Sequence, residues 1–184
     1  ALFALDKLYI TKLLAADSSA AYMLAFQLVV GGGLLFSSLN FITSVDLGRS
    51  TGGTGVVDRE KMYDLLKRTL LVAGGMLIAV CLLAFFLSRF LLQGYSQLPI
   101  FAFWLGLGYY LFLSVGRQTI LFVYRDAQLQ PAIVAAAIVG VAAAALFWTP
   151  WAGASAFAIC LVISCSLICI ACSNIFFLRK IAKR

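Results

Sequence analysis

The longest uncharged stretch of this chain runs from Ala127 to Leu178 and covers 52 residues. One membrane-spanning helix needs about 20 mostly apolar residues, so this stretch is long enough for two. Pro150 and Gly153 lie in its interior, and both residue types interrupt helices. We therefore expect two apolar helices here, joined by a turn over Thr149 to Ala154.

The composition extends this expectation to the whole chain. Of its 184 residues, 64% are hydrophobic and 11% are charged, whereas soluble domains have about 45–50% apolar and about 25% charged residues. In lipid each spanning segment must be helical, because its backbone groups have no water to bond. We expect an all-α polytopic membrane protein, a single bundle over residues 1–184 with five full transmembrane helices and one partial helix. The expected spans are 1–15 (partial), 18–45, 66–90, 99–124, 131–149 and 153–178.

The first residues are already apolar and begin with Ala rather than Met. A secretory signal would show a basic region, an apolar region and a cleavage site in that order, and this order is not present. We expect that the chain begins inside a helix and is a fragment of a longer protein.

The positive charges gather in alternate connections between the apolar segments. One set comprises Arg49, Arg59, Lys61, Lys67 and Arg68, then Arg125, and then Arg179, Lys180, Lys183 and Arg184, whereas the other set holds only Lys12 and Arg89. Because Lys and Arg accumulate in cytoplasmic connections, we expect the first set and the C-terminus to be cytoplasmic. This distribution also argues against a nucleic-acid partner, despite the net charge of +7.

The residue types that most enzymes and metal sites need are scarce. The chain has no His, and Asp6 is the only carboxylate that we expect inside the membrane, so we expect neither enzymatic activity nor a cofactor. Four of the five cysteines lie in one apolar segment; these are Cys160, Cys165, Cys169 and Cys172. Zinc sites usually add His or pair cysteines in a polar loop, so we interpret these cysteines as small packing residues on a helix face.

A few charged and polar residues are expected deep in the bilayer. Asp6 lies about ten residues from the turn near Ala16, which is about 15 Å along a helix, and Lys7 adjoins it. A charge at that depth costs about 2.5–3.5 kcal/mol and marks a functional site by default. Arg117 is expected about 12 Å from the cytoplasmic surface. The uncharged polar candidates in the spans are Gln118, Gln27, Asn40 and Asn174.

Two interpretations of these residues stay open. In the first, Arg117 extends to the cytoplasmic head groups, as long basic side chains do, and Lys7 pairs with Asp6 or with a missing helix. In the second, they line a water-filled cationic cavity that suits an anionic substrate. The glycines in the spans also have two interpretations: they allow close helix packing, which we favour, or they let a helix bend. They are Gly31, Gly32, Gly33, Gly74, Gly75, Gly106 and Gly108.

The order of several motifs resembles one family of transporters. DKLYITKLLAADSSAAYMLAFQLV, residues 6–29, looks like the start of the C-terminal half of a polysaccharide flippase. DREKMYDLLKR (58–68), FLLQGY (90–95), YRDAQLQP (124–131) and WAGASAFA (151–158) follow in the matching order. The chain therefore resembles the O-antigen type of lipid-linked oligosaccharide flippase, in the multidrug, oligosaccharidyl-lipid and polysaccharide exporter superfamily.

The resemblance implies one half of a twelve-helix transporter, with the first helix truncated. Members move lipid-linked oligosaccharide from the cytoplasmic to the outer leaflet of the bacterial inner membrane by alternating access, and a cationic cavity holds the anionic head group. Lys7 matches the basic position of the family's Asp-Arg/Lys pair. The implied partners are the lipid-linked oligosaccharide, membrane lipids, and either the missing N-terminal half or a second copy. Two alternatives remain: a multidrug or small-solute antiporter of the same superfamily, and a membrane scaffold that transports nothing.

Overall fold

The computed structural model describes residues 16–50, 59–126, 130–148 and 155–181, with side chains for a somewhat smaller set. Within these ranges all regular secondary structure is helical. The elements are α2 (Ala16–Ser50), α3 (Arg59–Phe86), the π-helix η1 (Leu87–Leu91), α4 (Leu98–Asp126), α5 (Gln130–Trp148) and α6 (Ala156–Ile181). The expected all-α fold is confirmed for the described part of the chain.

Four of the described helices are long and apolar enough to cross a membrane. Their spanning parts are Ser18–Ser38, Tyr63–Leu91, Leu98–Val115 and Ala156–Phe177. The apolar part of α5 that the structure describes, Ala132–Leu146, falls short of the roughly 20 residues that a span needs. The count of full spans is thus four rather than five among the described residues. The expected partial span 1–15 lies outside them.

Two helices extend beyond the apolar segments that predicted them. Helix α2 continues to Ser50 and α3 begins at Arg59, whereas the apolar segments end at Val45 and begin near residue 66. The length of an apolar segment reflects the thickness of the hydrocarbon layer. A helix can continue beyond that layer, because its backbone N–H and C=O groups still find their best hydrogen-bond partners within the helix. The charged residues there therefore lie on helix ends rather than in a loop.

The 52-residue uncharged stretch is divided between two helices, as expected. Helix α5 ends at Trp148 and α6 begins at Ala156. Ser155 caps α6: its hydroxyl oxygen accepts a hydrogen bond from the backbone N–H of Ala158 at 3.4 Å, which satisfies one of the free donors of the first turn. Pro131 is the second residue of α5, where its missing N–H costs nothing.

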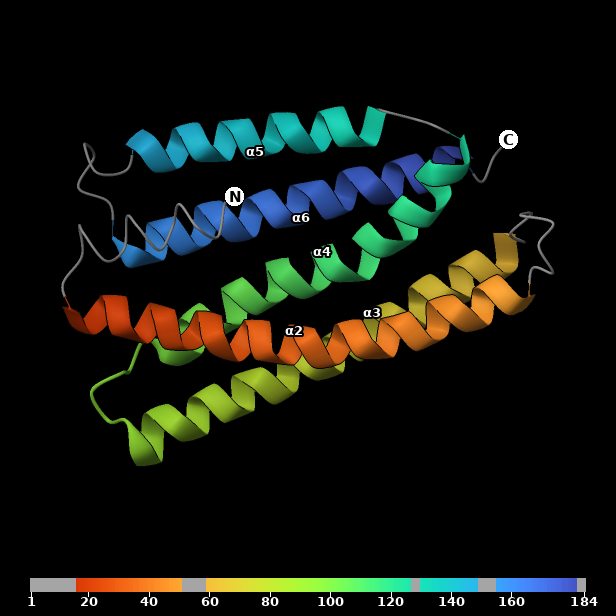
Figure 1. The fold of residues 1–184 in the computed structure, drawn as a ribbon. Helices are drawn as coiled ribbons and strands as arrows, with labels where there is room; N and C mark the ends of the chain where they lie inside the picture. Colours follow the sequence, from red (N-terminus) through yellow and green to blue (C-terminus); the bar gives the residue numbers. More distant parts are fainter. Residues whose placement is uncertain (1–15, 51–58, 127–129, 149–154, 182–184) are drawn as a thin grey trace.

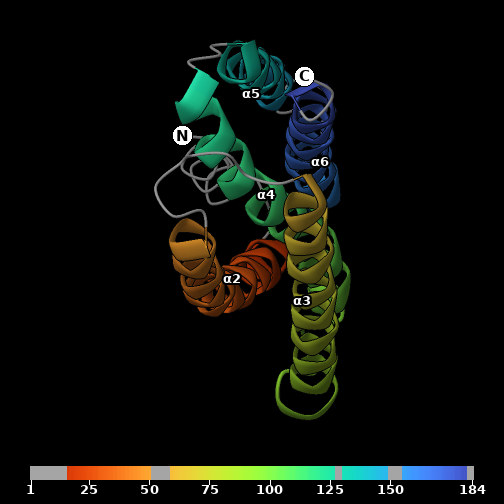
Figure 2. The ribbon, with the colours of Figure 1, turned by 90° about the vertical axis from the view of Figure 1, so that its right-hand side faces the viewer.

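The helices run along one common direction, and α4 crosses diagonally between the other pairs (Figures 1 and 2). It packs against α2, α3 and α6, whereas α5 packs mainly against α6. Because successive helices alternate in direction, their ends gather at two ends of the bundle. We call the end that holds Ser50, Arg59, Asp126 and Ile181 the basic end, and the end that holds Ala16, Leu98 and Ala156 the opposite end.

The contact between α2 and α4 shows what holds the bundle together. The Tyr110 hydroxyl donates a hydrogen bond to the Val29 carbonyl at 3.0 Å, and both side chains are buried. The same hydroxyl lies so close to Gly32 that a Cβ atom at position 32 would collide with it. In lipid the hydrophobic effect does not drive helices together, so close packing and interhelical hydrogen bonds must.

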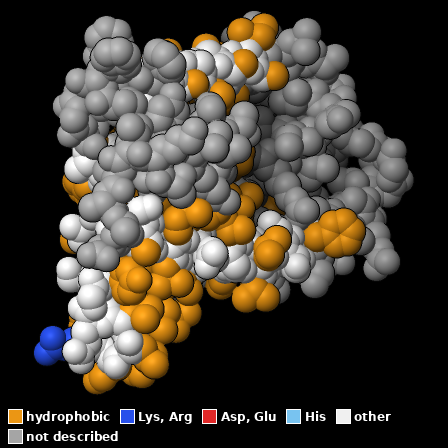
Figure 3. All heavy atoms as spheres, turned by 60° about the vertical axis from the view of Figure 1, so that its left-hand side comes forward, with side chains coloured by type: hydrophobic (Ala, Val, Ile, Leu, Met, Phe, Trp, Pro, Cys, Tyr) orange, Lys and Arg blue, Asp and Glu red, His pale blue; other side chains and the backbone are white. Residues whose placement is uncertain are grey.

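Helix α3 has a different environment. Most of its large apolar side chains are exposed within the described part of the chain, among them Leu71, Ile78, Leu82, Phe85 and Phe86. Figure 3 shows hydrophobic side chains spread over the surface of the bundle, with blue Lys or Arg side chains in only one place on this view. A surface of this kind is typical of helices that face lipid or another membrane helix.

Candidate functional site

The two charges predicted deepest in the membrane, Asp6 and Lys7, lie outside the residues that the structure describes. Their roles stay predictions. The remaining predicted residues lie on described helices, although the side chains of Asn40, Arg117 and Gln118 are not described. Because the helix backbones are described, the positions of these residues along the bundle axis can be compared. Contacts between neighbouring helices serve as the reference points.

The first reference point joins α2 to α4, which run in the same direction (Figure 1). The rings of Tyr22 and Phe101 meet edge to face, with centroids 5.8 Å apart. Asn40 follows Tyr22 by 18 residues, and Gln118 follows Phe101 by 17. At about 1.5 Å per residue, these two positions fall at nearly the same level of the bundle.

The second reference point joins α4 to α6, which also run in the same direction. A Cβ on Gly108 would lie 2.9 Å from the carbonyl oxygen of Ser164, so the two backbones almost touch there. Gln118 and Asn174 each follow this contact by ten residues. They too share one level, and the Asn174 side chain is only 7% exposed.

We call the positions Asn40, Arg117, Gln118 and Asn174 the polar level. They lie on three helices, seven to ten residues from the basic ends of those helices, which is about 10–15 Å. Helix α4 leaves α2 and approaches α6 towards the basic end (Figures 1 and 2). These four positions share a level of the bundle, and their residue types, one Arg and three amides, can supply donors for an anion and both donors and acceptors for a polar group.

Gln27 is not part of the polar level. It is exposed on α2 and precedes Asn40 by 13 residues, which is about 20 Å along the helix. Gly31, Leu34 and Ser38 are exposed along the same stripe of α2. The structure therefore brings Asn40 to the level of Arg117 and Gln118 but leaves Gln27 nearer to the opposite end.

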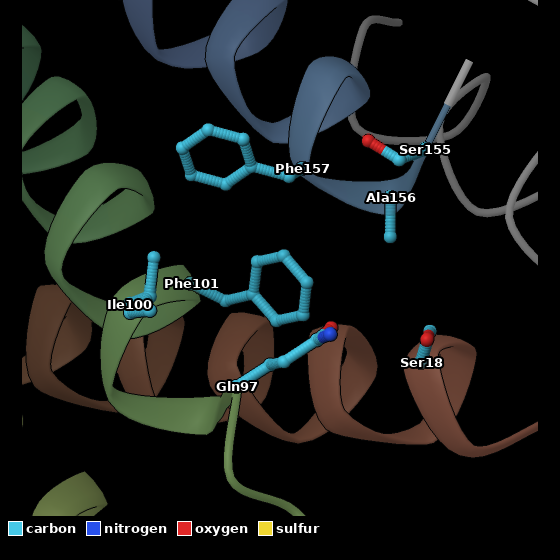
Figure 4. A pocket seen from close by; sticks show the side chains of 7 residues that line it. All are labelled: Ser18, Gln97, Ile100, Phe101, Ser155, Ala156 and Phe157. Carbon is cyan, nitrogen blue, oxygen red and sulfur yellow. The ribbon is translucent and has the colours of Figure 1, made fainter.

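A pocket of about 440 Å³ lies at the opposite end, where α2, α4 and α6 begin (Figure 4). Its described lining consists of Ser18, Gln97, Ile100, Phe101, Ser155, Ala156 and Phe157. Ala156 and Phe157 come from α6 on one side (Figure 4). On the other side Ser18 comes from α2, Gln97 from the turn before α4, and Phe101 from the first turn of α4. A smaller pocket of about 90 Å³ shares Ser18 and Gln97.

Local hydrogen bonds build this pocket. The Gln97 carbonyl accepts a hydrogen bond from the backbone N–H of Phe101 at 3.1 Å, and this bond starts helix α4. The Leu98 N–H donates to the Tyr95 carbonyl at 3.0 Å in the turn before the helix. The sequence predicted spans that start at 99 and 153, close to the observed starts of α4 and α6. It did not indicate that the residues at these two helix starts line a common pocket.

The cysteines divide into two groups. Cys160 is buried, as a packing residue should be, whereas Cys165, Cys169 and Cys172 are exposed and follow one another at helical spacing. The packing interpretation therefore fits Cys160 and does not fit these three in the described chain. Within the described residues no three His, Cys, Asp or Glu side chains are placed to hold a metal ion.

Comparisons of the chain with protein-family models, with curated proteins and with solved structures give no match. The fold and the polar level therefore define a class only: an all-helical, multi-pass membrane protein with polar positions inside its helices.

Proposed function

We propose that this chain is one helical half of a transporter that moves lipid-linked oligosaccharide from the cytoplasmic to the outer leaflet by alternating access. The observation that carries this proposal is the polar level. A charged or amide side chain on a spanning helix, about 10–15 Å from the basic end of that helix, is costly unless it reaches the head groups or faces protein or water. Four such positions on three helices at one depth favour a passage over a purely structural bundle.

The chemistry of the polar level favours an anionic substrate. The Arg117 guanidinium has the planar fork that binds phosphate with two parallel hydrogen bonds. Neither Asp nor Glu lies within four residues of Arg117, Asn40 or Asn174. An antiporter driven by protons or sodium would favour carboxylates at such a level, so the phosphate-linked head group of a lipid-linked oligosaccharide is the better fit.

The orientation follows from the ends of the bundle. The basic end gathers the helix ends that carry most of the Lys and Arg residues, and the positive-inside rule assigns such an end to the cytoplasm. In this orientation the polar level is nearer to the cytoplasmic face, where the substrate is loaded. We place the protein in the bacterial plasma membrane, with the second half of the transporter supplied by further helices or by a second copy.

The test is complementation of a flippase-deficient strain by the full-length protein, with surface polysaccharide and protein level both measured. Arg117→Ala and Lys7→Ala should each lower surface polysaccharide at least about tenfold at normal protein level, because each removes a charge-assisted contact to the head group. Lys7→Arg should be milder because the charge remains. Arg89→Ala, which removes an exposed charge at the opposite end, is the matched control. Full complementation by both Ala variants would remove the polar level from the mechanism.

A further inference from the structure

The pocket at the opposite end has two kinds of lining. Ser18, Gln97 and Ser155 present hydroxyl and amide groups, while the rings of Phe101 and Phe157 form apolar walls (Figure 4). Phe157 is 40% exposed, so part of its ring is accessible to a ligand within the described structure. None of the described lining residues carries a charge.

The polar and apolar groups of this lining determine which class of ligand fits the pocket. Without a charged partner in the described lining, a phosphate or an ammonium group has no ion pair to form there. A lipid acyl chain would fill the apolar part but would form no hydrogen bonds with the amide or the hydroxyls. A neutral sugar ring has both features: an apolar face of C–H groups for an aromatic ring, and hydroxyls that both donate to and accept from an amide.

The size and position agree with this ligand. Pockets for small ligands are about 300–1,000 Å³ and combine apolar walls with a few polar groups, and this pocket has about 440 Å³. Phe101 precedes Arg117 by 16 residues of α4, which is about 24 Å. The pocket is therefore separate from the polar level and lies towards the other face of the membrane.

We propose that this pocket binds one neutral sugar residue of the transported glycan on the outer side of the membrane. Phe157 stacks on the apolar face of the sugar, and Gln97 forms hydrogen bonds with its hydroxyls. This inference rests on the proposed function, because that function supplies the glycan. The polar level then holds the charged head group, and the pocket receives the sugar chain that emerges after translocation.

The experiment places a photoreactive phenylalanine derivative at position 157 of the full-length protein in its native membranes. After illumination, the adducts on the peptide are analysed by mass spectrometry, which distinguishes sugar fragments from acyl-chain fragments. The matched control places the same derivative at position 176, since Phe176 is 65% exposed near the other end of the same helix. We expect sugar-bearing adducts at position 157 and only lipid adducts at position 176.

A second variant tests the polar contact. Gln97→Leu keeps the volume of the side chain but removes its donor and acceptor, so the yield of sugar adducts at position 157 should fall about three- to tenfold. Acyl-chain adducts alone at position 157, or an undiminished sugar yield with Gln97→Leu at equal protein level, would overturn the proposal. Failure of transport itself is seen separately, in the complementation test, because neither Arg117 nor Lys7 contacts this pocket in the proposal.

Discussion

The glycines at the contacts of α4 and the glycines of α3 have opposite surroundings. A Cβ on Gly108 would lie 2.9 Å from the Ser164 carbonyl oxygen, and a Cβ on Gly106 would lie 2.8 Å from a methyl group of Leu77. By contrast, no described atom outside the local helix backbone lies within 4 Å of a Cβ placed on Gly74 or Gly75. The same residue type thus marks a tight helix contact in one region and an open surface in the other.

This difference divides the bundle into a centre and a periphery. Around α4, small residues let backbones approach and a buried hydroxyl joins two helices, which are the main sources of association in lipid. One face of α3 also packs on α4 and buries Ala73, Val80 and Ala84. Its outer face, with the open space around Gly74 and Gly75, provides no such contacts with the described chain. We infer that α4 and the helix faces packed against it form the stable unit, and that the outer face of α3 faces lipid or further helices.

The largest effect should come from Gly108→Val. Its branched side chain would collide with the backbone of Ser164, and backbone atoms cannot move aside as a flexible side chain can. Overpacking of this kind costs about 1–3 kcal/mol or more, so the unfolding temperature of the purified protein in detergent should fall clearly. Gly75→Val is the matched control and should have little effect. Equal losses in the two variants would abolish the distinction between centre and periphery.

The next largest effect concerns the hydroxyl that links α4 to α2. Tyr110→Phe removes the hydrogen bond to the Val29 carbonyl while keeping the ring, and such bonds in membrane proteins contribute about 0.6–1.7 kcal/mol. The free energy of unfolding should decrease by this amount. Tyr63→Phe, at an exposed position of α3, should leave it unchanged. A Tyr110→Phe protein as stable as the original would mean that packing alone joins these helices.

A smaller effect of opposite sign is expected at Gly75→Ala. The added methyl group meets open space, and replacing Gly by Ala at a compatible helical position stabilises a protein by about 0.4–1 kcal/mol. The unfolding temperature should rise slightly. If stability rises but complementation fails, we would infer that this face of α3 is covered by a partner in the assembled protein. A loss of stability in the isolated protein would contradict the open surface.

The smallest effect is expected at the exposed ion pair of α3. The Arg68 guanidinium lies 2.8 Å from the Asp64 carboxylate one helical turn earlier, and both side chains are largely exposed. Pairs of this kind contribute about 0.3–0.5 kcal/mol and weaken as salt is added. Arg68→Ala should therefore change the free energy of unfolding by less than about 0.5 kcal/mol, measured at low and at high salt. A larger change in the free energy of unfolding would mean that this part of α3 belongs to the packed centre of the bundle.

Much of the fold could be predicted from the sequence because charges and helix breakers mark the segments directly. The break between α5 and α6 followed from Pro150 and Gly153, and the helical class followed from the apolar stretches. The basic residues of alternate connections also predicted which helix ends share one end of the bundle. These features depend on position along the chain and need no knowledge of contacts.

The contacts themselves could not be predicted. The spanning helices are apolar on most sides, so periodicity does not reveal which face is buried. Gly75 and Gly108 have similar sequence surroundings, and only the packing distinguishes them. The pocket was missed for the same reason: Gln97 and Phe157 are 60 residues apart in the sequence and line one pocket only because α4 and α6 begin at the same end of the bundle.

Depletion of the protein from its cells is the sharpest test of the proposal that it moves lipid-linked oligosaccharide across the membrane. Lipid-linked oligosaccharides are extracted during depletion and measured together with surface polysaccharide. We expect complete lipid-linked units to accumulate on the cytoplasmic leaflet while surface polysaccharide falls. Re-expression of the original protein should reverse both changes, whereas re-expression of Arg117→Ala should not. Unchanged levels of lipid-linked oligosaccharide on depletion, with normal surface polysaccharide, would contradict it.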